Sequence, residues 1–154
     1  MICTNIESQI SQVNEYPWMA AIATTDESFY CGGSLIASQW ILTASHCLFK
    51  NPDGTDPRLP SELRIVLGEH DINSATESTI PRKVVEVTQI ITHPDYDASN
   101  IITTNDNNDI ALLKLSEEID MNVYTPACVA KTTDNFGGQN ALVYGQIDYE
   151  LKQN

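Results

Sequence analysis

The sequence predicts an all-β fold, a barrel or a sandwich, and three observations support this. The apolar runs are short, none keeps a helical period, and segments rich in Gly, Pro, Asn, Asp and Ser separate them. Several short strands joined by such loops are typical of barrels and sandwiches. The 154 residues suffice for one domain with a core, and an apolar fraction of 42% argues against wholesale disorder.

Six apolar runs are the candidate strands, and several of them are rich in β-branched residues. In chain order they are residues 18–23, 34–36, 40–42, 63–67, 84–91 and 110–115. The intervening segments 51–54, 70–79 and 95–108 have the composition of loops. After residue 115 the short apolar runs no longer recur, so residues 116–139 are interpreted as an extended connector. One more apolar run follows at 141–144.

The composition is acidic, with a formal charge of −13 from 21 acidic and 8 basic side chains. Nucleic acid and anionic membranes would repel such a chain, so we expect neither as a partner. No apolar stretch approaches the roughly 18 residues that a membrane-spanning helix needs. Residues 1–8 lack a basic segment followed by an apolar run, so no signal peptide is visible.

The four cysteines are Cys3, Cys31, Cys47 and Cys128. They include no C-x-x-C pair, which argues against a zinc knuckle or a thioredoxin-type redox motif. Disulfides would require an oxidising compartment, which the missing signal peptide does not support. The residues alone leave two possibilities open, an incomplete N-terminus or free thiols.

Two motifs contain the residues that are candidates for catalysis. The first combines C-G-G-S-L-I at 31–36 with W-I-L-T-A-S-H-C at 40–47, and the second is N-D-I-A-L-L at 108–113. An imidazole can take the proton of a weak hydroxyl nucleophile, and a carboxylate can fix its tautomer. Taken alone, His46 would be interpreted as a structural histidine and Asp109 as a turn residue.

Together these motifs resemble the trypsin/chymotrypsin-type serine proteases, whose histidine segment usually reads T-A-A-H-C. Here Ser45 replaces the second alanine. Four further landmarks occur in the family's order: E-Y-P-W at 15–18, L-G-E-H at 67–70, H-P-D-Y at 93–96 and P-A-C at 126–128. The resemblance covers residues 14–145 and implies an antiparallel Greek-key β-barrel, the first barrel of the trypsin-like two-barrel fold.

The resemblance assigns His46 as the general base and Asp109 as its orienting partner in a serine endopeptidase that acts on proteins or peptides without a cofactor. By motif position, His70 and His93 are not expected to be catalytic, nor is Ser45. The family's nucleophile lies in a G-D-S-G-G-P motif of the second barrel, beside oxyanion donors worth roughly 2.7–4 kcal/mol each. That motif does not occur here. We therefore expect a missing second barrel and an inactive chain.

The family's organisation divides the chain into a pro-segment-like stretch (1–13), the first barrel (14–115), and the connector with the start of a truncated second barrel (116–154). It also implies an extracellular protein. The alternative is a non-catalytic protease homologue that acts as a binding or regulatory module.

The resemblance further implies a Cys31–Cys47 disulfide, worth about 3 kcal/mol in the chain-entropy model, and a Cys3–Cys128 disulfide. Some family members bind calcium in the loop that begins at Glu69. That residue, Asp71 and Glu77 offer hard oxygen ligands. The loop is longer than the family's, however, and Arg82 falls near an expected acidic ligand, so we expect no metal.

Overall fold

The computed structural model describes residues 12–51, 54–69, 79–98, 107–131, 133–135 and 137. Two short 3-10 helices, η1 (Ser45–Leu48) and η2 (Pro60–Glu62), lie between the third and fourth strands. Among these residues, no helix is long and apolar enough to cross a membrane. The strands are β1 (Met19–Thr24), β2 (Phe29–Ala37), β3 (Trp40–Thr43), β4 (Leu63–Leu67), β5 (Lys83–Thr92) and β6 (Ala111–Leu115).

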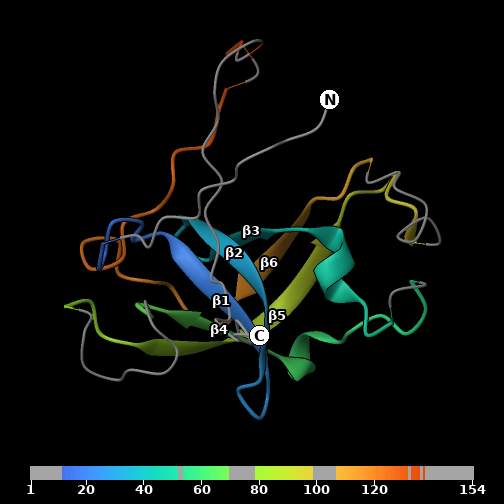
Figure 1. Ribbon diagram of the computed structural model, residues 1–154, viewed down its shortest axis with the longest axis horizontal. Coiled ribbons are helices and arrows are strands. Elements are labelled where there is room, and N and C mark those ends of the chain that lie inside the picture. The colour runs from blue at the N-terminus through green and yellow to red at the C-terminus, as the bar shows by residue number, and fades with distance from the viewer. Residues whose placement is uncertain are drawn as a thin grey trace, which may run out of the picture.

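These six antiparallel strands close a barrel in the order β1-β2-β3-β6-β5-β4 (Figure 1). Because β4 also pairs with β1, the strands β4-β1-β2-β3 lie side by side in Greek-key order. The predicted all-β barrel is therefore confirmed, and each of the six candidate runs forms a strand. The apolar run at 141–144 lies outside the described residues.

The core lies inside the barrel and results from the alternation along the strands. In β6, Ala111, Leu113 and Leu115 are buried, whereas Leu112 and Lys114 are only half-buried. Burying one large aliphatic side chain stabilises the fold by about 1.5–3 kcal/mol. Fully buried members of the core include Ile22, Leu35, Ile41, Leu63, Ile65, Leu67 and Leu113.

A glycine allows β2 and β3 to pack closely. A Cβ atom at Gly33 would lie 2.7 Å from Cγ2 of Ile41 and 3.0 Å from the carbonyl oxygen of Leu42. Nearby, the Thr43 hydroxyl donates a hydrogen bond of 2.8 Å to the carbonyl of Gly32. The end of β3 is thereby held against the middle of β2, which carries one of the cysteines.

The chain after β6 packs back onto the barrel. Ile119 and Tyr124 are buried, and the Ile119 amide donates to the carbonyl of Ser38 at 2.7 Å. The Tyr124 hydroxyl donates to the carbonyl of Pro81 at 2.7 Å. Residues after the last barrel strand are therefore part of the packed unit.

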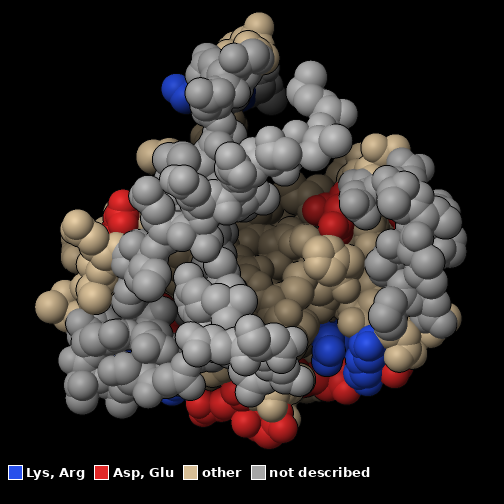
Figure 2. Space-filling view, viewed as in Figure 1, with Lys and Arg blue, Asp and Glu red and all other residues tan. Residues whose placement is uncertain are grey.

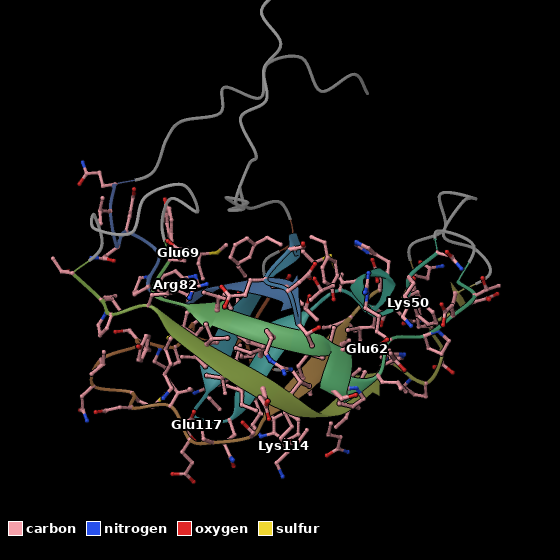
Figure 3. All side chains as sticks on the ribbon, turned by 90° about the horizontal axis from the view of Figure 1, so that it is seen from below. Lys50, Glu62, Glu69, Arg82, Lys114 and Glu117 are labelled. Atoms are coloured by element: carbon pink, nitrogen blue, oxygen red, sulfur yellow. A yellow bond between two sulfur atoms is a disulfide. The ribbon has the colours of Figure 1, made fainter. Side chains whose placement is uncertain are left out.

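Charged side chains lie on the outer surface, and acidic ones gather along one edge of the face in Figure 2. Basic residues pair with some of the acids, as Figure 3 shows for Lys50 with Glu62 at 2.8 Å and Arg82 with Glu69 at 2.9 Å. Exposed ion pairs contribute about 0–1 kcal/mol each. The apolar core, rather than this surface, therefore provides most of the stability.

We expect Tyr124→Phe to lower the free energy of unfolding by about 0.5–1.5 kcal/mol, because the Pro81 carbonyl loses its buried donor. Burial also raises the pKa of Tyr124 above its usual value of 10.0. The neutral phenol therefore stabilises the fold fully below the unfolded-state pKa, and this contribution is lost as the pH rises through the folded-state pKa. The difference between wild type and variant should be constant up to about pH 10 and shrink above it.

Urea denaturation at neutral and alkaline pH measures this difference. Tyr16→Phe is the matched control, since its hydroxyl donates a 3.0 Å hydrogen bond to the carboxylate of the exposed Glu15. A Tyr124→Phe protein as stable as the wild type at neutral pH would contradict the expectation.

Candidate active site

The pairing of β3 with β6 brings the two sequence motifs together. Thr43, the last residue of β3, lies opposite Ala111, the first residue of β6. The helix η1 comes after β3 and carries His46, whereas Asp109 comes just before β6. Two residues that are 63 positions apart in the sequence therefore lie side by side.

Asp109 holds His46 at two points. Its Oδ2 atom lies 2.7 Å from the ring Nδ1 of His46, and its Oδ1 atom accepts a 2.9 Å hydrogen bond from the backbone N–H of the same residue. The carboxylate side chain is 17% exposed and the histidine side chain 51% exposed. A carboxylate at Nδ1 favours the tautomer with its proton there. In the neutral ring, Nε2 is then free to accept a proton.

Asn108 sets the direction of Asp109, and sequence reasoning missed its role. Asn108 has a φ of 59°, in the left-handed region that asparagine tolerates better than most residues. Its carbonyl accepts a 2.7 Å hydrogen bond from the Ile110 amide, which closes a tight bend around the carboxylate. The available signal was an asparagine directly before the candidate aspartate, which we interpreted only as the last residue of the loop 95–108.

Ser45 and His93 lie close to the site but make other bonds. The Ser45 side chain is fully buried, and its hydroxyl donates to the carbonyl of Ile110 at 2.8 Å. It therefore links η1 to the segment before β6 and is not directed at the His46 ring. The Nδ1 atom of His93 accepts a 3.2 Å hydrogen bond from the Asp95 amide. His70 lies outside the described residues.

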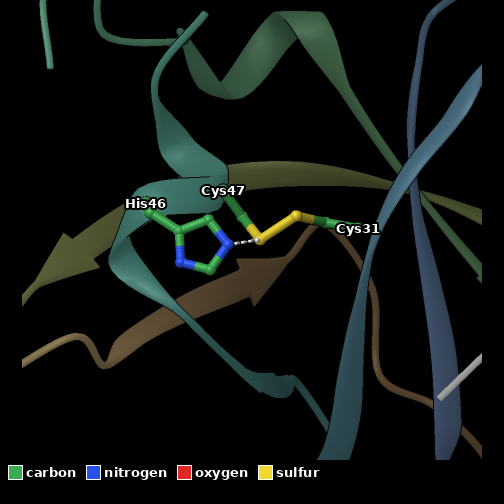
Figure 4. A group of neighbouring side chains, drawn as sticks. All are labelled: Cys31, His46 and Cys47. Atoms are coloured by element: carbon green, nitrogen blue, oxygen red, sulfur yellow. Dashed lines mark hydrogen bonds between the residues drawn. A yellow bond between two sulfur atoms is a disulfide. The ribbon is translucent and has the colours of Figure 1, made fainter. Parts of the chain in front are cut away.

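A disulfide joins Cys31 of β2 to Cys47 of η1, with Cα atoms 6.1 Å apart, which confirms the expected pairing. The Sγ atom of Cys47 lies 3.5 Å from the Nε2 atom of His46 (Figure 4). The ring thus has a carboxylate at one nitrogen and a disulfide sulfur near the other. Cys128 is exposed and has no disulfide partner among the described residues. Its expected partner, Cys3, lies outside the described residues, so that disulfide stays a prediction.

The described part of the candidate calcium loop does not fit a cation site. The Glu69 carboxylate accepts a 2.9 Å hydrogen bond from Nε of Arg82, and the same guanidinium also bonds to Glu27. Arg82 thus supplies the positive charge that a metal ion would bring. Asp71 and Glu77 lie outside the described residues.

This arrangement can accept and return a proton at Nε2 while Asp109 stabilises the resulting imidazolium. Among the described residues, no hydroxyl is hydrogen-bonded to Nε2; its contact is the sulfur of Cys47. The described residues therefore contain an oriented base, His46, but no hydroxyl positioned to act as its nucleophile.

Comparison with known proteins gives a family match. The family model described as Trypsin matches residues 6–146. The chain is 30% identical over 146 residues to a venom serine protease of Polistes dominula and 37% identical over 139 residues to venom serine protease 34 of Apis mellifera. It is also 34% identical over 143 residues to the inactive CLIP domain-containing serine protease A28 of Anopheles gambiae.

The alignments cover 90%, 86% and 88% of this chain, respectively. They cover only 48%, 32% and 34% of those relatives, so the chain spans less than half of their length. Because the family model matches most of the chain and the barrel carries the motifs in order, the chain belongs to the trypsin family of serine proteases.

Proposed function

We propose that this chain supplies the general base, His46, and its orienting carboxylate, Asp109, to a serine endopeptidase. The observation that carries the proposal is the two-point contact in which Asp109 accepts hydrogen bonds from both the ring and the backbone of His46. This contact fixes both the tautomer and the position of the ring. A base needs this orientation if it is to take a proton from a hydroxyl nucleophile.

In the proposed reaction, Nε2 of His46 takes the proton of a serine hydroxyl as the serine attacks the carbonyl of a peptide bond. The same nitrogen then returns the proton to the leaving amine, and water hydrolyses the acyl-enzyme by the reverse path. Asp109 stays ionised and stabilises the imidazolium. The substrate is a protein or peptide, and the mechanism uses no cofactor.

The nucleophile and the oxyanion donors are proposed to lie in a second barrel outside these residues, because the sequence contains no G-D-S-G-G-P motif. In this proposal residues 1–13 correspond to a pro-segment, 14–115 to the first barrel, and 116–154 to the connector and the start of the second barrel. The Cys31–Cys47 disulfide and the two relatives named as venom proteases support an extracellular location.

A second candidate function is a non-catalytic binding or regulatory module. One relative that matches 88% of this chain is named as an inactive protease, which favours this alternative. The two candidate functions predict different coding sequences after codon 154 of the transcript. An in-frame nucleophile motif would support the endopeptidase, whereas a stop codon would support the module.

We predict that the purified 154-residue protein does not react with an organophosphonate active-site probe, because the probe requires an activated serine and an oxyanion site. Mass spectrometry of the intact protein measures labelling, with an active trypsin-family protease as the positive control. Stoichiometric labelling of any serine in the chain would contradict the prediction.

Fusion to the nucleophile-bearing second barrel of an active trypsin-family protease should produce peptide hydrolysis. In that chimera, Asp109→Asn should lower kcat by roughly 10⁴-fold, as the same change does elsewhere in this family. His46→Ala should lower it by roughly 10⁶-fold. Asp95→Asn, at an exposed position, is the matched control and should leave kcat unchanged.

Steady-state kinetics on a peptide amide measures these changes, and circular dichroism checks that each chimera is folded. A folded, active chimera in which Asp109→Asn retains wild-type kcat would disprove the proposed role of this carboxylate.

A further inference from the structure

Arg58 differs from the other two arginines of the chain because it has no acidic partner. Arg64 pairs with Glu86 at 3.2 Å, and Arg82 bonds to two glutamates. No hydrogen bond or ion pair joins the Arg58 side chain to another described residue. In a chain with 21 acidic side chains, a half-buried arginine without a carboxylate indicates that its partner comes from another molecule.

The ring of Tyr30 supports the Arg58 guanidinium. The Cζ atom of Arg58 lies 4.2 Å from the centroid of this ring, which is within the range of a cation–π contact. The Nε atom of Arg58 and the hydroxyl of Tyr30 are both buried without a hydrogen-bond partner among the described residues. The two Nη atoms of Arg58 are not buried in this way. The stacked guanidinium therefore presents two unpaired donor nitrogens at the surface.

Neighbouring groups leave the charge of Arg58 without a direct counterion. Asp56 and Glu62, which are close to it in the sequence, pair with Lys50 at 3.5 and 2.8 Å, and Figure 3 shows the second of these pairs. The other carboxylate oxygen of Glu62 accepts a hydrogen bond from a backbone amide. Burial raises the pKa of Tyr30 above its usual value of 10.0, so its phenol is neutral at physiological pH.

Backbone pairing places Arg58 beside the helix that carries the candidate base. The Arg58 amide donates a 2.8 Å hydrogen bond to the carbonyl of Leu48, the last residue of η1. A β-bridge joins the next residue along, Phe49, to Pro57. The loop that leaves η1 thus returns alongside it, and Arg58 lies next to a residue only two positions after His46.

Tyr30 reaches the same place from β2 because of an irregularity in that strand. In the pairing of β1 with β2, Ile22 lies opposite Cys31 and Ala23 lies opposite Phe29, so Tyr30 is the extra residue of a β-bulge. Bulges redirect a side chain and are common beside active sites. The next residue, Cys31, is covalently bound to η1 through its disulfide. Tyr30 and Arg58 therefore both adjoin the candidate active site.

We propose that Arg58 binds a carboxylate of the protein substrate and thereby selects an acidic side chain close to the bond that is cleaved. The N–H groups of a guanidinium form a planar fork that matches the two oxygens of a carboxylate. Stacking on Tyr30 holds this fork in one orientation before the substrate arrives. The selectivity rests on the proposed function of His46, whereas the carboxylate site itself does not.

The net charge of the chain limits this selectivity to one position of the substrate. At −13, the chain repels an acidic peptide as a whole. Attraction by Arg58 acts at short range, because salt screens exposed charges beyond roughly 8–10 Å. We therefore expect one favoured position for an acidic residue, rather than a general preference for acidic substrates.

Binding is tested on the full 154-residue chain by NMR, through the Nε–H signal of Arg58, which its loss in Arg58→Lys assigns. The probes are capped alanine peptides that carry a single glutamate, and matching peptides with glutamine in its place. The glutamate peptide should shift this signal at roughly tenfold lower concentration than its glutamine counterpart, because a hydrogen bond between two charged groups is stronger than one to a neutral amide.

Selectivity is tested in the chimera with an active second barrel, on quenched fluorescent peptides in which one glutamate or glutamine moves along both sides of the cleaved bond. At one position, kcat/KM for glutamate should exceed that for glutamine by roughly tenfold. Arg58→Gln should abolish this ratio, and Arg58→Lys should lower it because an ammonium lacks the planar fork. Lys131→Gln removes the same charge at an exposed position and is the matched control that should keep the ratio.

Two variants of Tyr30 test the role of its ring. Tyr30→Leu should lower the glutamate-to-glutamine ratio, because it removes the surface on which the guanidinium is stacked. Tyr30→Phe keeps the ring and should keep the ratio. Circular dichroism checks that each variant is folded, and a merely structural effect would lower kcat/KM for both peptides equally.

The proposal is overturned if glutamate and glutamine peptides shift the Arg58 signal equally or not at all. It is also overturned if an active chimera shows no glutamate preference at any position, or if Arg58→Gln keeps that preference. An inactive chimera whose parent chain binds the glutamate peptide selectively would count against the endopeptidase function and support the carboxylate site. The two proposals can therefore fail independently.

Discussion

The antiparallel pairing of β3 with β6 is the constraint on which the rest of the site depends. Ile41 and Leu113 lie opposite each other in this pair, and both are fully buried in the core. A slip of one residue would turn both side chains out of the core. It would also move Asp109 by about 3.3 Å along the strand, which is enough to break its hydrogen bonds to His46. Apolar packing inside the barrel thus sets the register of a polar site at its rim.

The polar contacts around the site direct side chains more than they hold the fold together. Each intramolecular hydrogen bond adds only about 0.5–1.5 kcal/mol of net stability, which is less than one buried core leucine. Asn108 bends the chain so that Asp109 faces the histidine, and Ser45 links η1 to the carbonyl of Ile110. These residues determine where the His46 ring lies, because η1 is too short to fix it alone.

The sequence predicted the strands better than it predicted the site. The short apolar runs gave all six strands, including the β-branched run that forms most of β5. They did not distinguish a barrel from a sandwich, because closure depends on β1 pairing with β4 at long range. The family resemblance predicted that closure and the Cys31–Cys47 bond. The left-handed backbone of Asn108 and the contact between His46 and Cys47 depend on torsion angles, which neither motif spacing nor composition reveals.

The function of His46 depends on which group approaches its second nitrogen. Asp109 occupies the side of Nδ1, and the Cys47 sulfur closes one approach to Nε2 at 3.5 Å. A hydroxyl nucleophile must come within roughly 2.7–3.0 Å of the same nitrogen. It therefore has to arrive from the solvent side, where the half-exposed ring leaves room. The first barrel thus fixes the orientation of His46 and leaves the solvent side open as the approach for the serine that we propose a second barrel supplies.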